Sequence, residues 1–293
     1  LSAVEGLLRV FQQPASAQNR MPELPEVETI CRGLRSHLEG RRILRVTVRE
    51  RRLRCLVDRK LAWHLEGKTI VRVGRIAKYI LIALSGDIVW LIHLGMSGKL
   101  VHVTPDTPKQ KHDHILVSLD TGGELRYHDP RRFGISMVVA GNELDDVPQL
   151  KHLGLDPFDG RFTSSYLHAF TKRSDRRIRD LLLDQQIVAG IGNIYANEIL
   201  ARVGVRPTAR ARKLKRAKVE AIAAMIPEVL KEAIRWCGTS FSDYRDADDK
   251  FGEFQNHLRV YDRDGEKCRL CPSPIRRVAI GNRSAFYCPS CQK

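Results

Sequence analysis

The spacing of apolar residues changes along the chain and divides it into regions of different secondary structure. From Pro25 to Leu38 the apolar residues recur at helical intervals, and Gly40 follows as a stop, which predicts an amphipathic helix. The region that follows consists of short β-branched runs separated by Gly, Asp or Ser, and such runs predict strands. The predicted strands are Ile43–Val48, Thr69–Val73, Tyr79–Ala83, Ile88–His93, Ile115–Leu119 and Ile135–Ala140. Many short strands between turns are typical of a β-sandwich or barrel, and we expect the first helix at its edge or end.

Helical spacing returns after an acidic, turn-rich segment, 141–159, which we interpret as a linker. The predicted helices are Tyr166–Phe170, Arg176–Leu183, Gly192–Val203 and Ala217–Trp236. A basic run, 206–218, separates the last two of them. This run is open to two interpretations, a solvated charged face or a surface that meets phosphates.

Composition narrows the class of protein. The chain has 293 residues, 43% of them hydrophobic, which suits two domains and a small appendage. Its 50 Lys and Arg against 34 Asp and Glu leave a net charge of +16, and such an excess favours a polyanionic partner, most commonly nucleic acid. No apolar run approaches the roughly 18 residues that a membrane span needs. We expect a soluble, intracellular protein without a membrane partner.

The clearest chemical signal is at the C-terminus, where four of the seven cysteines form two Cys-x-x-Cys pairs. Cys268 and Cys271 make the first pair, and Cys288 and Cys291 make the second. Between the pairs, two strand-like runs flank a Gly-Asn turn, which predicts a β-hairpin with Arg283 at its tip, where a phosphate could be met. Four thiolates fill a tetrahedral site and leave no open position for chemistry, so we expect one structural Zn²⁺.

Several short motifs together resemble one family. They are MPELPEVE at 21–28, AKY at 77–79, HLGMSG at 93–98, KHDH at 111–114, DPRRFG at 129–134, GIGNIYANE at 190–198 and AFYCPSCQK at 285–293. In this order they resemble the bacterial formamidopyrimidine-DNA glycosylases from Met21 to Lys293. We do not interpret KHDH as a metal site, because no further pair of ligands is evident.

The resemblance implies an α+β multidomain fold. A catalytic N-terminal β-sandwich with flanking helices would span residues 21–150, and a helical helix–two-turns–helix domain with a base-capping loop would span 151–258. The zinc β-hairpin finger would span 259–293. Residues 1–20 lie outside the resemblance and are expected to be an extraneous N-terminal extension or the product of an upstream start.

The resemblance also implies an activity, the repair of damaged double-stranded DNA by base excision. It implies removal of 8-oxoguanine and formamidopyrimidines by a secondary amine, followed by β- and δ-elimination of the abasic strand. That amine would be Pro22 once Met21 is removed, with Glu23 as the acid/base and Glu26 orienting the amine or a water. Lys78 and Arg283 match residues that hold phosphates beside the lesion.

Further positions match residues that bind DNA in the family. Met96, Arg131 and Phe133 match side chains that fill the space left by the flipped nucleotide. Asn193, near a predicted helix start, matches a donor to a phosphate. His93 and His112 match polar residues near the DNA backbone. We expect a monomer acting in the cytoplasm of a bacterium, at the nucleoid.

Two departures and two alternatives stay open. Arg179 stands where relatives often have lysine, and we expect it still to meet a phosphate of the DNA. Ser242, in the predicted capping loop Thr239–Asn256, stands where some relatives have a basic residue. The first alternative is an enzyme of the endonuclease VIII kind, which prefers oxidised pyrimidines. The second is a zinc-finger protein that binds damaged DNA without cutting it, which would apply if residues 1–20 keep Pro22 in an internal amide.

Overall fold

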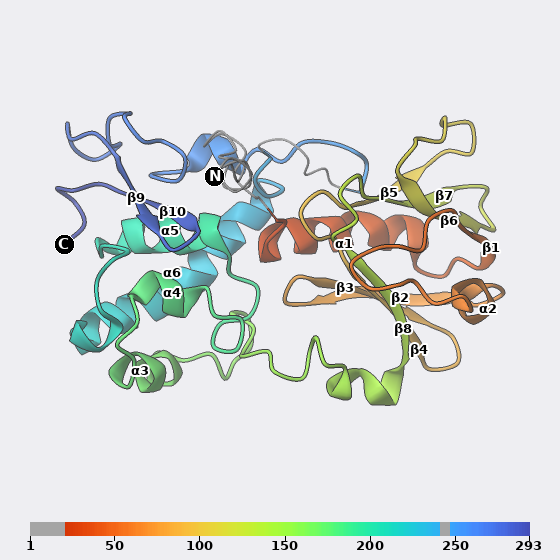
Figure 1. Ribbon diagram of the computed structural model, residues 1–293, viewed down its shortest axis with the longest axis horizontal. Helices are drawn as coiled ribbons and strands as arrows, with labels where there is room; N and C mark the ends of the chain where they lie inside the picture. The colour runs from red at the N-terminus through yellow and green to blue at the C-terminus, as the bar shows by residue number, and fades with distance from the viewer. Residues whose placement is uncertain (1–20, 241–246) are drawn as a thin grey trace, which may run out of the picture.

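The chain forms two lobes that meet at one helix (Figure 1). The computed structural model describes residues 21–240 and 247–293. The expected extension, 1–20, and Ser242 of the predicted capping loop lie outside the described residues. One lobe holds the strands β1–β8, and the other holds the helices α3–α6 with the hairpin β9–β10.

The first lobe is a β-sandwich. One antiparallel sheet has the order β1-β6-β7-β5, and the other has the order β2-β3-β4-β8. Their strands are β1 (Ile43–Val48), β2 (Ile70–Ile76), β3 (Tyr79–Leu84), β4 (Ile88–His93), β5 (Lys99–Val103), β6 (Asp113–Leu119), β7 (Glu124–His128) and β8 (Ile135–Ala140). The predicted sandwich is confirmed, and the single apolar core between the sheets contains residues of both.

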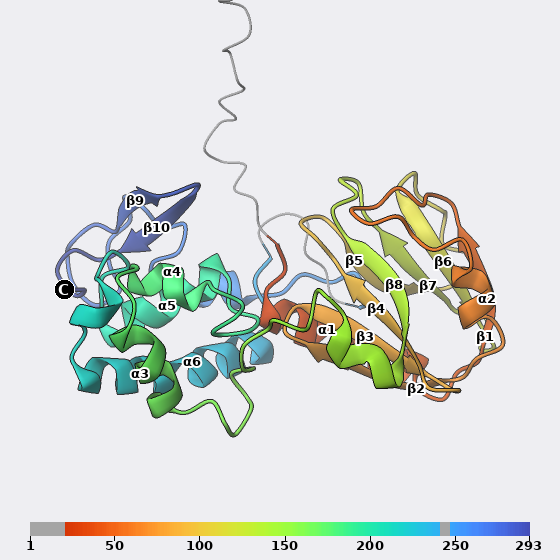
Figure 2. The same ribbon diagram turned by 60° about the horizontal axis from the view of Figure 1, so that its bottom comes forward.

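Helix α1 (Leu24–Leu38) lies along the edge of the sandwich, next to the edge strands β2 and β5 (Figure 2). Val27, Ile30 and Leu34 enter the core of the sandwich, as their helical spacing predicts. Leu24, one turn earlier, instead packs in the core of the helical lobe, and its backbone N–H donates to Gly190 at 3.1 Å. The first turn of α1 therefore crosses the boundary between the two lobes and places Pro22 and Glu23 there.

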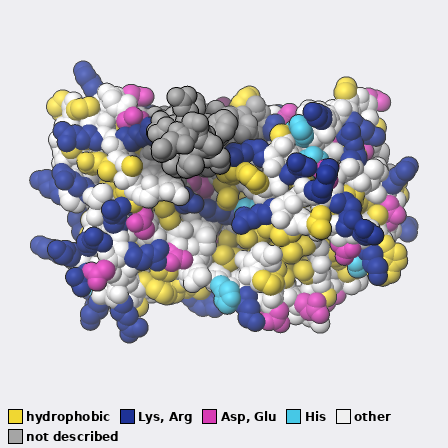
Figure 3. Space-filling view, viewed as in Figure 1, with side chains coloured by type: hydrophobic (Ala, Val, Ile, Leu, Met, Phe, Trp, Pro, Cys, Tyr) yellow, Lys and Arg dark blue, Asp and Glu magenta, His cyan; other side chains and the backbone are white. Residues whose placement is uncertain are grey.

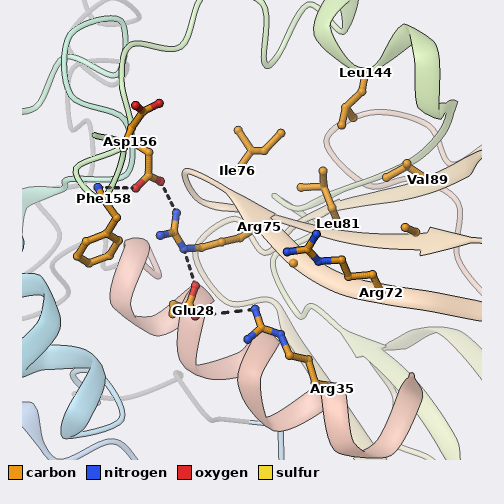
Figure 4. A pocket seen from close by; sticks show the side chains of 13 residues that line it. Glu28, Arg35, Arg72, Arg75, Ile76, Leu81, Val89, Leu144, Asp156 and Phe158 are labelled. Atoms are coloured by element: carbon orange, nitrogen blue, oxygen red, sulfur yellow. Dashed lines mark hydrogen bonds and ion pairs between the residues drawn. The ribbon is translucent and has the colours of Figure 1, made fainter. Parts of the chain in front are cut away.

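The segment between the lobes contains a 3₁₀ helix, η1 (Gly141–Asp146), and an arginine bridge secures it (Figure 4). Arg75 on β2 donates to Glu28 on α1 at 2.9 Å and to Asp156 in the linker at 2.5 Å. Its side chain is only 8% exposed, so both ion pairs are shielded from water. Beside it, a hollow of about 590 Å³ is open over Ile76, Leu81 and Phe158. The bridge fixes the linker against both the helix and the sheet.

The second lobe contains α3 (Ser164–Lys172), α4 (Ile178–Leu182), α5 (Asn193–Val203) and α6 (Arg216–Arg235), with the 3₁₀ helices η2 (Ala211–Lys213) and η3 (Phe254–His257). All four predicted helices are present, with bounds within a few residues of those expected. Among the described residues, no helix combines the length and the apolar character needed to cross a membrane.

The predicted C-terminal hairpin is β9 (Arg276–Ile280) and β10 (Arg283–Tyr287), joined by Gly281 and Asn282. It is attached to α5 through side chains that accept backbone hydrogen bonds. The Asn197 side-chain oxygen accepts from the Phe286 N–H at 2.8 Å. The buried Glu198 carboxylate accepts from the N–H groups of Arg259, Val260 and Tyr261, where the chain enters the finger. The finger is therefore seated on α5 rather than tethered loosely to it.

Candidate active site and DNA-binding surface

The N-terminus of α1 meets the N-terminus of α5, and Glu23 joins them. The buried Glu23 carboxylate accepts backbone hydrogen bonds from Gly192 at 2.8 Å, Ile194 at 2.9 Å and Tyr195 at 3.4 Å. A helix N-terminus offers unpaired N–H groups and a positive dipole end, so it suits a carboxylate. A Cβ at Gly192 would lie 2.3 Å from the carboxyl carbon of Glu23, so the close approach requires glycine. Glu23 thus occupies one fixed position beside Pro22, which is also buried.

A second carboxylate, Glu26, lies one turn further along α1 and binds back to the start of the helix. It accepts from the Glu23 N–H at 2.9 Å and from the Thr239 N–H at 2.8 Å. The Tyr195 hydroxyl also donates to it, at 2.5 Å. Glu26 therefore fixes the peptide between Pro22 and Glu23 to Tyr195 on α5 and to Thr239, four residues beyond the end of α6.

Burial dominates the electrostatics of this pair. It raises the pKa of Glu23, and the Lys78 ammonium and the α5 N–H groups oppose that rise. Burial and the neighbouring Glu23 charge raise the pKa of Glu26 to about 7. Burial also lowers the pKa of Lys78, which Glu23 counteracts and Arg283 reinforces. Burial thus shifts the pKa of each of the two acids and of the amine toward its uncharged form, as is typical of groups that transfer protons.

Cationic side chains from three parts of the chain gather around this centre. Lys78 occupies the tight turn between β2 and β3, after Ala77 with its positive φ of 51°. Arg283 begins β10 at the fingertip and is exposed, and its charge acts on both Lys78 and Arg179. The sandwich and the finger therefore present positive charge to the same place.

Arg179 and Asn193 are engaged with each other and with the finger. Arg179 is 1% exposed, and its guanidinium donates to the Asn193 side-chain oxygen at 2.8 Å. The Asn193 amide donates to the Ser284 carbonyl at 3.0 Å. The buried position of Arg179 was not evident from the sequence. Direct contact of either side chain with a phosphate stays a prediction, and the described contacts give the pair a role in seating the finger.

The three residues expected to fill the space left by the flipped nucleotide come from two neighbouring loops. Met96 is half-buried in the Gly95–Gly98 turn after β4. Arg131 and Phe133 are exposed in the loop between β7 and β8, with the guanidinium 5.0 Å from the ring centre. An exposed guanidinium on an exposed aromatic ring is a surface on which a base can stack.

The two expected histidines differ in exposure. His93 is buried, its Nδ1 accepts from the Gly95 N–H at 3.1 Å, and burial together with the Lys78 charge lowers its pKa to about 4. It is therefore neutral at pH 7 and shapes the turn that carries Met96. His112 is half-buried, and its ring lies about 6 Å from those of His114 and His128.

The predicted zinc ligands converge. The four sulfurs of Cys268, Cys271, Cys288 and Cys291 lie within 4.8 Å of one another, and this is the one such group of metal-ligating side chains found in the described part of the chain. Individual Sγ–Sγ separations are 3.4, 3.5 and 4.0 Å. A Zn–S bond of about 2.3 Å in a tetrahedron requires sulfurs about 3.8 Å apart. The donor set and its size fit a zinc ion.

Other residues of the site were missed in the sequence. Tyr195 and Thr239 contact Glu26, and Ser97 and Asp129 connect the two loops that carry Met96 and Arg131. All except Thr239 lie inside the family motifs quoted above, and that position was the signal in the sequence that could have identified them. Their hydrogen-bond partners are distant along the chain, so spacing alone could not assign them.

Figure 3 shows Lys and Arg side chains over both ends of the face drawn, with fewer and scattered Asp and Glu. Such a basic surface is suited to a phosphate backbone. Together with a buried acid–base pair at the lobe boundary and a metal-held hairpin beside it, it defines the class of zinc-finger DNA glycosylases. Comparison with known proteins names the family within that class.

Three family models match consecutive parts of the chain. The formamidopyrimidine-DNA glycosylase N-terminal domain matches residues 21–136, and its H2TH domain matches residues 153–245. A zinc finger found in FPG and IleRS matches residues 265–293. The chain belongs to the formamidopyrimidine-DNA glycosylase family.

Individual relatives agree with the models. The formamidopyrimidine-DNA glycosylases of Thioalkalivibrio sulfidiphilus and Hahella chejuensis are 46% and 42% identical, over 93% of this chain and 100% of their own. Among solved structures, Lactococcus lactis Fpg bound to abasic-site DNA has a TM-score of 0.86 at 32% identity, over 92% of this chain and 99% of that one. MutM (Fpg) of Thermus thermophilus has a TM-score of 0.83 at 35% identity, over 92% and 98%.

Proposed function

We propose that the chain is a bifunctional base-excision repair enzyme that removes oxidised purines, 8-oxoguanine and formamidopyrimidines, from double-stranded DNA and then cuts the strand. The observation that carries this proposal is the position of Pro22 and Glu23, which lie at the lobe boundary against the N-terminus of α5. Structures of Lactococcus lactis Fpg with abasic-site DNA and with Fapy-dG DNA support the substrate class.

The chemistry requires Pro22 to be the first residue, since only then is its nitrogen a secondary amine. That nitrogen attacks C1′ of the damaged nucleotide, the glycosidic bond breaks, and the base leaves with a proton. Opening of the sugar ring gives an iminium ion, which draws electrons and allows the 3′ and then the 5′ phosphate to be eliminated. We therefore propose that the active form begins at Pro22; the N-terminal family model matches from residue 21.

Glu23 supplies the protons for these steps. Protonated, it assists opening of the sugar ring, and ionised, it accepts the proton released in elimination. Its raised pKa favours the protonated form, and the α5 N–H groups keep the carboxylate in one orientation. Glu26 holds the peptide that carries the amine, because its carboxylate accepts from the Glu23 N–H.

The cations bind the strand that is being repaired. We assign Lys78 and Arg283 to phosphates beside the lesion, with Asn193 and Arg179 holding the fingertip that presents Arg283. Met96, Arg131 and Phe133 would fill the gap left by the flipped nucleotide, with Arg131 offering donors to the orphaned base. His93 and His112 would lie near the DNA backbone.

The domains divide these tasks. Residues 21–150 carry the amine and the filling side chains, residues 151–258 carry the α5 N-terminus, and residues 259–293 form the finger. The zinc would be held by Cys268, Cys271, Cys288 and Cys291, and its chemistry is structural, because four thiolates complete its coordination. One flipped nucleotide needs one centre, so we propose a monomer that works in the bacterial cytoplasm.

Borohydride trapping tests the proposal. Protein beginning at Leu1 and protein beginning at Pro22 are each incubated with a duplex containing 8-oxoguanine and with one containing an oxidised pyrimidine. We expect the Pro22 form alone to become covalently joined to DNA, and faster on 8-oxoguanine. Faster trapping on the pyrimidine would favour an activity of the endonuclease VIII kind. Binding of the zinc-loaded Pro22 form without trapping would leave a non-catalytic protein that binds damaged DNA.

A further inference from the structure

The loops that carry Met96 and Arg131 are joined by one buried carboxylate, that of Asp129. Its side chain is 0% exposed and accepts three hydrogen bonds. The donors are the Ser97 hydroxyl at 2.7 Å, the Tyr127 hydroxyl at 3.2 Å and the Gly134 N–H at 2.9 Å. Ser97 belongs to the Met96 turn, and Gly134 follows Phe133. The carboxylate therefore connects both loops to strand β7.

Ser97 makes the connection reciprocal. Its O–H group donates to Asp129, and its oxygen accepts from the Arg131 N–H at 3.2 Å. The Asp129 carbonyl oxygen accepts from the Arg132 N–H at 3.2 Å, which closes a turn in which Arg132 has a positive φ of 59°. Arg131 is thus fixed through its own backbone and through the residue that follows it.

The loops also touch through their backbones. Gly95 has a φ of 65°, and a Cβ there would lie 2.6 Å from the carbonyl carbon of Phe133. No side chain fits between the two loops at this point. Met96 and Phe133 therefore keep a fixed separation, and a movement of one loop moves the other.

The burial of the Asp129 carboxylate costs free energy of folding, which suggests that it has a functional role. Burying a carboxylate without a cation is unfavourable, and three hydrogen-bond donors offset that cost without making the burial favourable. Within residues 21–240 and 247–293, no ion pair of Asp129 is found. A network of this kind fixes a unique geometry rather than adding stability. The geometry that it fixes here is that of the two loops.

We propose that Asp129 and Ser97 are positioning residues that hold Met96, Arg131 and Phe133 as one rigid wedge, and that the wedge opens the duplex at the lesion. This inference rests on the proposed function. It predicts that duplex and single-stranded substrates depend on different residues of the protein. Base removal from a duplex needs the wedge, because a nucleotide must leave the stack. Cleavage of a single-stranded abasic site needs the amine, Glu23 and the phosphate contacts but not the wedge, since no partner base is left behind.

The test compares Ser97→Ala and Asp129→Ala with a control, Ser136→Ala, in protein that begins at Pro22. Ser136 is also buried in the sandwich, where its hydroxyl accepts from the Trp90 indole at 2.9 Å, and it has no bond to either loop. Single-turnover rates are measured on an 8-oxoguanine duplex and on a single-stranded abasic oligonucleotide. A 2-aminopurine opposite the lesion reports on loss of stacking by fluorescence.

We expect Ser97→Ala and Asp129→Ala to slow duplex excision by about 10-fold or more, as misplacement of a positioned group does. Both should weaken the 2-aminopurine signal and cut the single-stranded substrate at the control's rate. Equal losses on the two substrates would mean a general structural role and would overturn the inference, as would unchanged duplex excision. If the unsubstituted protein cuts neither substrate, it is the proposed function that fails.

Discussion

At the residue scale, the position of Glu26 makes the stability of the fold depend on pH. Its pKa is raised from 4.5 to about 7 by burial and by Glu23, so between these values the folded chain holds a proton that the unfolded chain has lost. Stability from this group is therefore greatest at low pH and is lost as pH rises through 7. We expect Glu26→Gln to remove this dependence, so that its stability relative to the unsubstituted protein improves from pH 5 to pH 8.

The expected change across that interval is on the order of 2 to 3 kcal/mol, measured by urea unfolding at each pH. Gln also loses one acceptor, but that loss is a constant offset and does not alter the slope. Glu143→Gln, at an exposed position in η1, is the matched control and should give a flat difference. A flat difference for Glu26→Gln as well would show that Glu26 is ionised throughout the range.

Only part of this site could be predicted from the sequence. The Cys-x-x-Cys pairs predict their own metal centre, because ligand spacing within each pair is local. Pro22 and Glu23 would read as an ordinary helix start without the family resemblance. Tyr195 contacts Glu26, and Asp129 contacts Ser97, across many intervening residues, and only the folded backbone brings those atoms together.

At the element scale, the finger depends on its metal. The hairpin β9–β10 is too small to bury a core of its own, and structural zinc supplies about 10 to 16 kcal/mol of folding free energy in such peptides. The finger contacts α5 through Asn197 and Glu198, which accept hydrogen bonds from backbone N–H groups of the finger and of the segment leading into it. Those N–H groups have a fixed position only when the finger is folded. Loss of zinc should therefore release Arg283 while the sandwich stays intact.

We expect Cys288→Ser, or removal of zinc by a chelator, to weaken DNA binding by about 100-fold, equivalent to about 2.7 kcal/mol. Binding is followed by fluorescence anisotropy, and the sandwich by its near-ultraviolet circular dichroism. Cys55→Ser is the control, since Cys55 lies in the sandwich region, outside the zinc cluster. If the metal-free protein binds DNA as tightly as the zinc-loaded protein, the finger has no part in the interface.

Elements with a clear apolar period were predicted, and those without one were not. Strands β1, β4 and β8 have the expected bounds, and the finger hairpin turns at the expected Gly-Asn pair. Strands β5 and β7 were missed, because charged and histidine side chains interrupt their apolar residues. The five-residue α2 (Leu61–Leu65) was missed because it buries only its two leucines. Short elements of this kind are fixed by neighbouring strands rather than by their own sequence.

At the scale of the whole molecule, three separate parts of the chain contribute charge to one centre. Lys78 comes from the sandwich, Arg179 from the helical lobe and Arg283 from the finger, and the charge of Arg283 acts on each of the other two. The net charge of +16 predicts a polyanionic partner but not where it binds. The fold supplies the location, because the Arg75 bridge and the first turn of α1 fix the two lobes relative to each other.

Removal of the fingertip charge should therefore change how DNA binding depends on salt. If Arg283 contacts a phosphate, Arg283→Ala releases one fewer counterion, and the slope of log K against log salt falls in magnitude by about 0.9. The slope is measured by fluorescence anisotropy with a duplex that carries a stable abasic-site analogue. Arg59→Ala removes an equal charge next to α2, at the end of the sandwich far from the α1 N-terminus, and should leave the slope unchanged. Equal reductions in the two variants would mean that the chain binds DNA by its overall charge and not at the centre around Glu23.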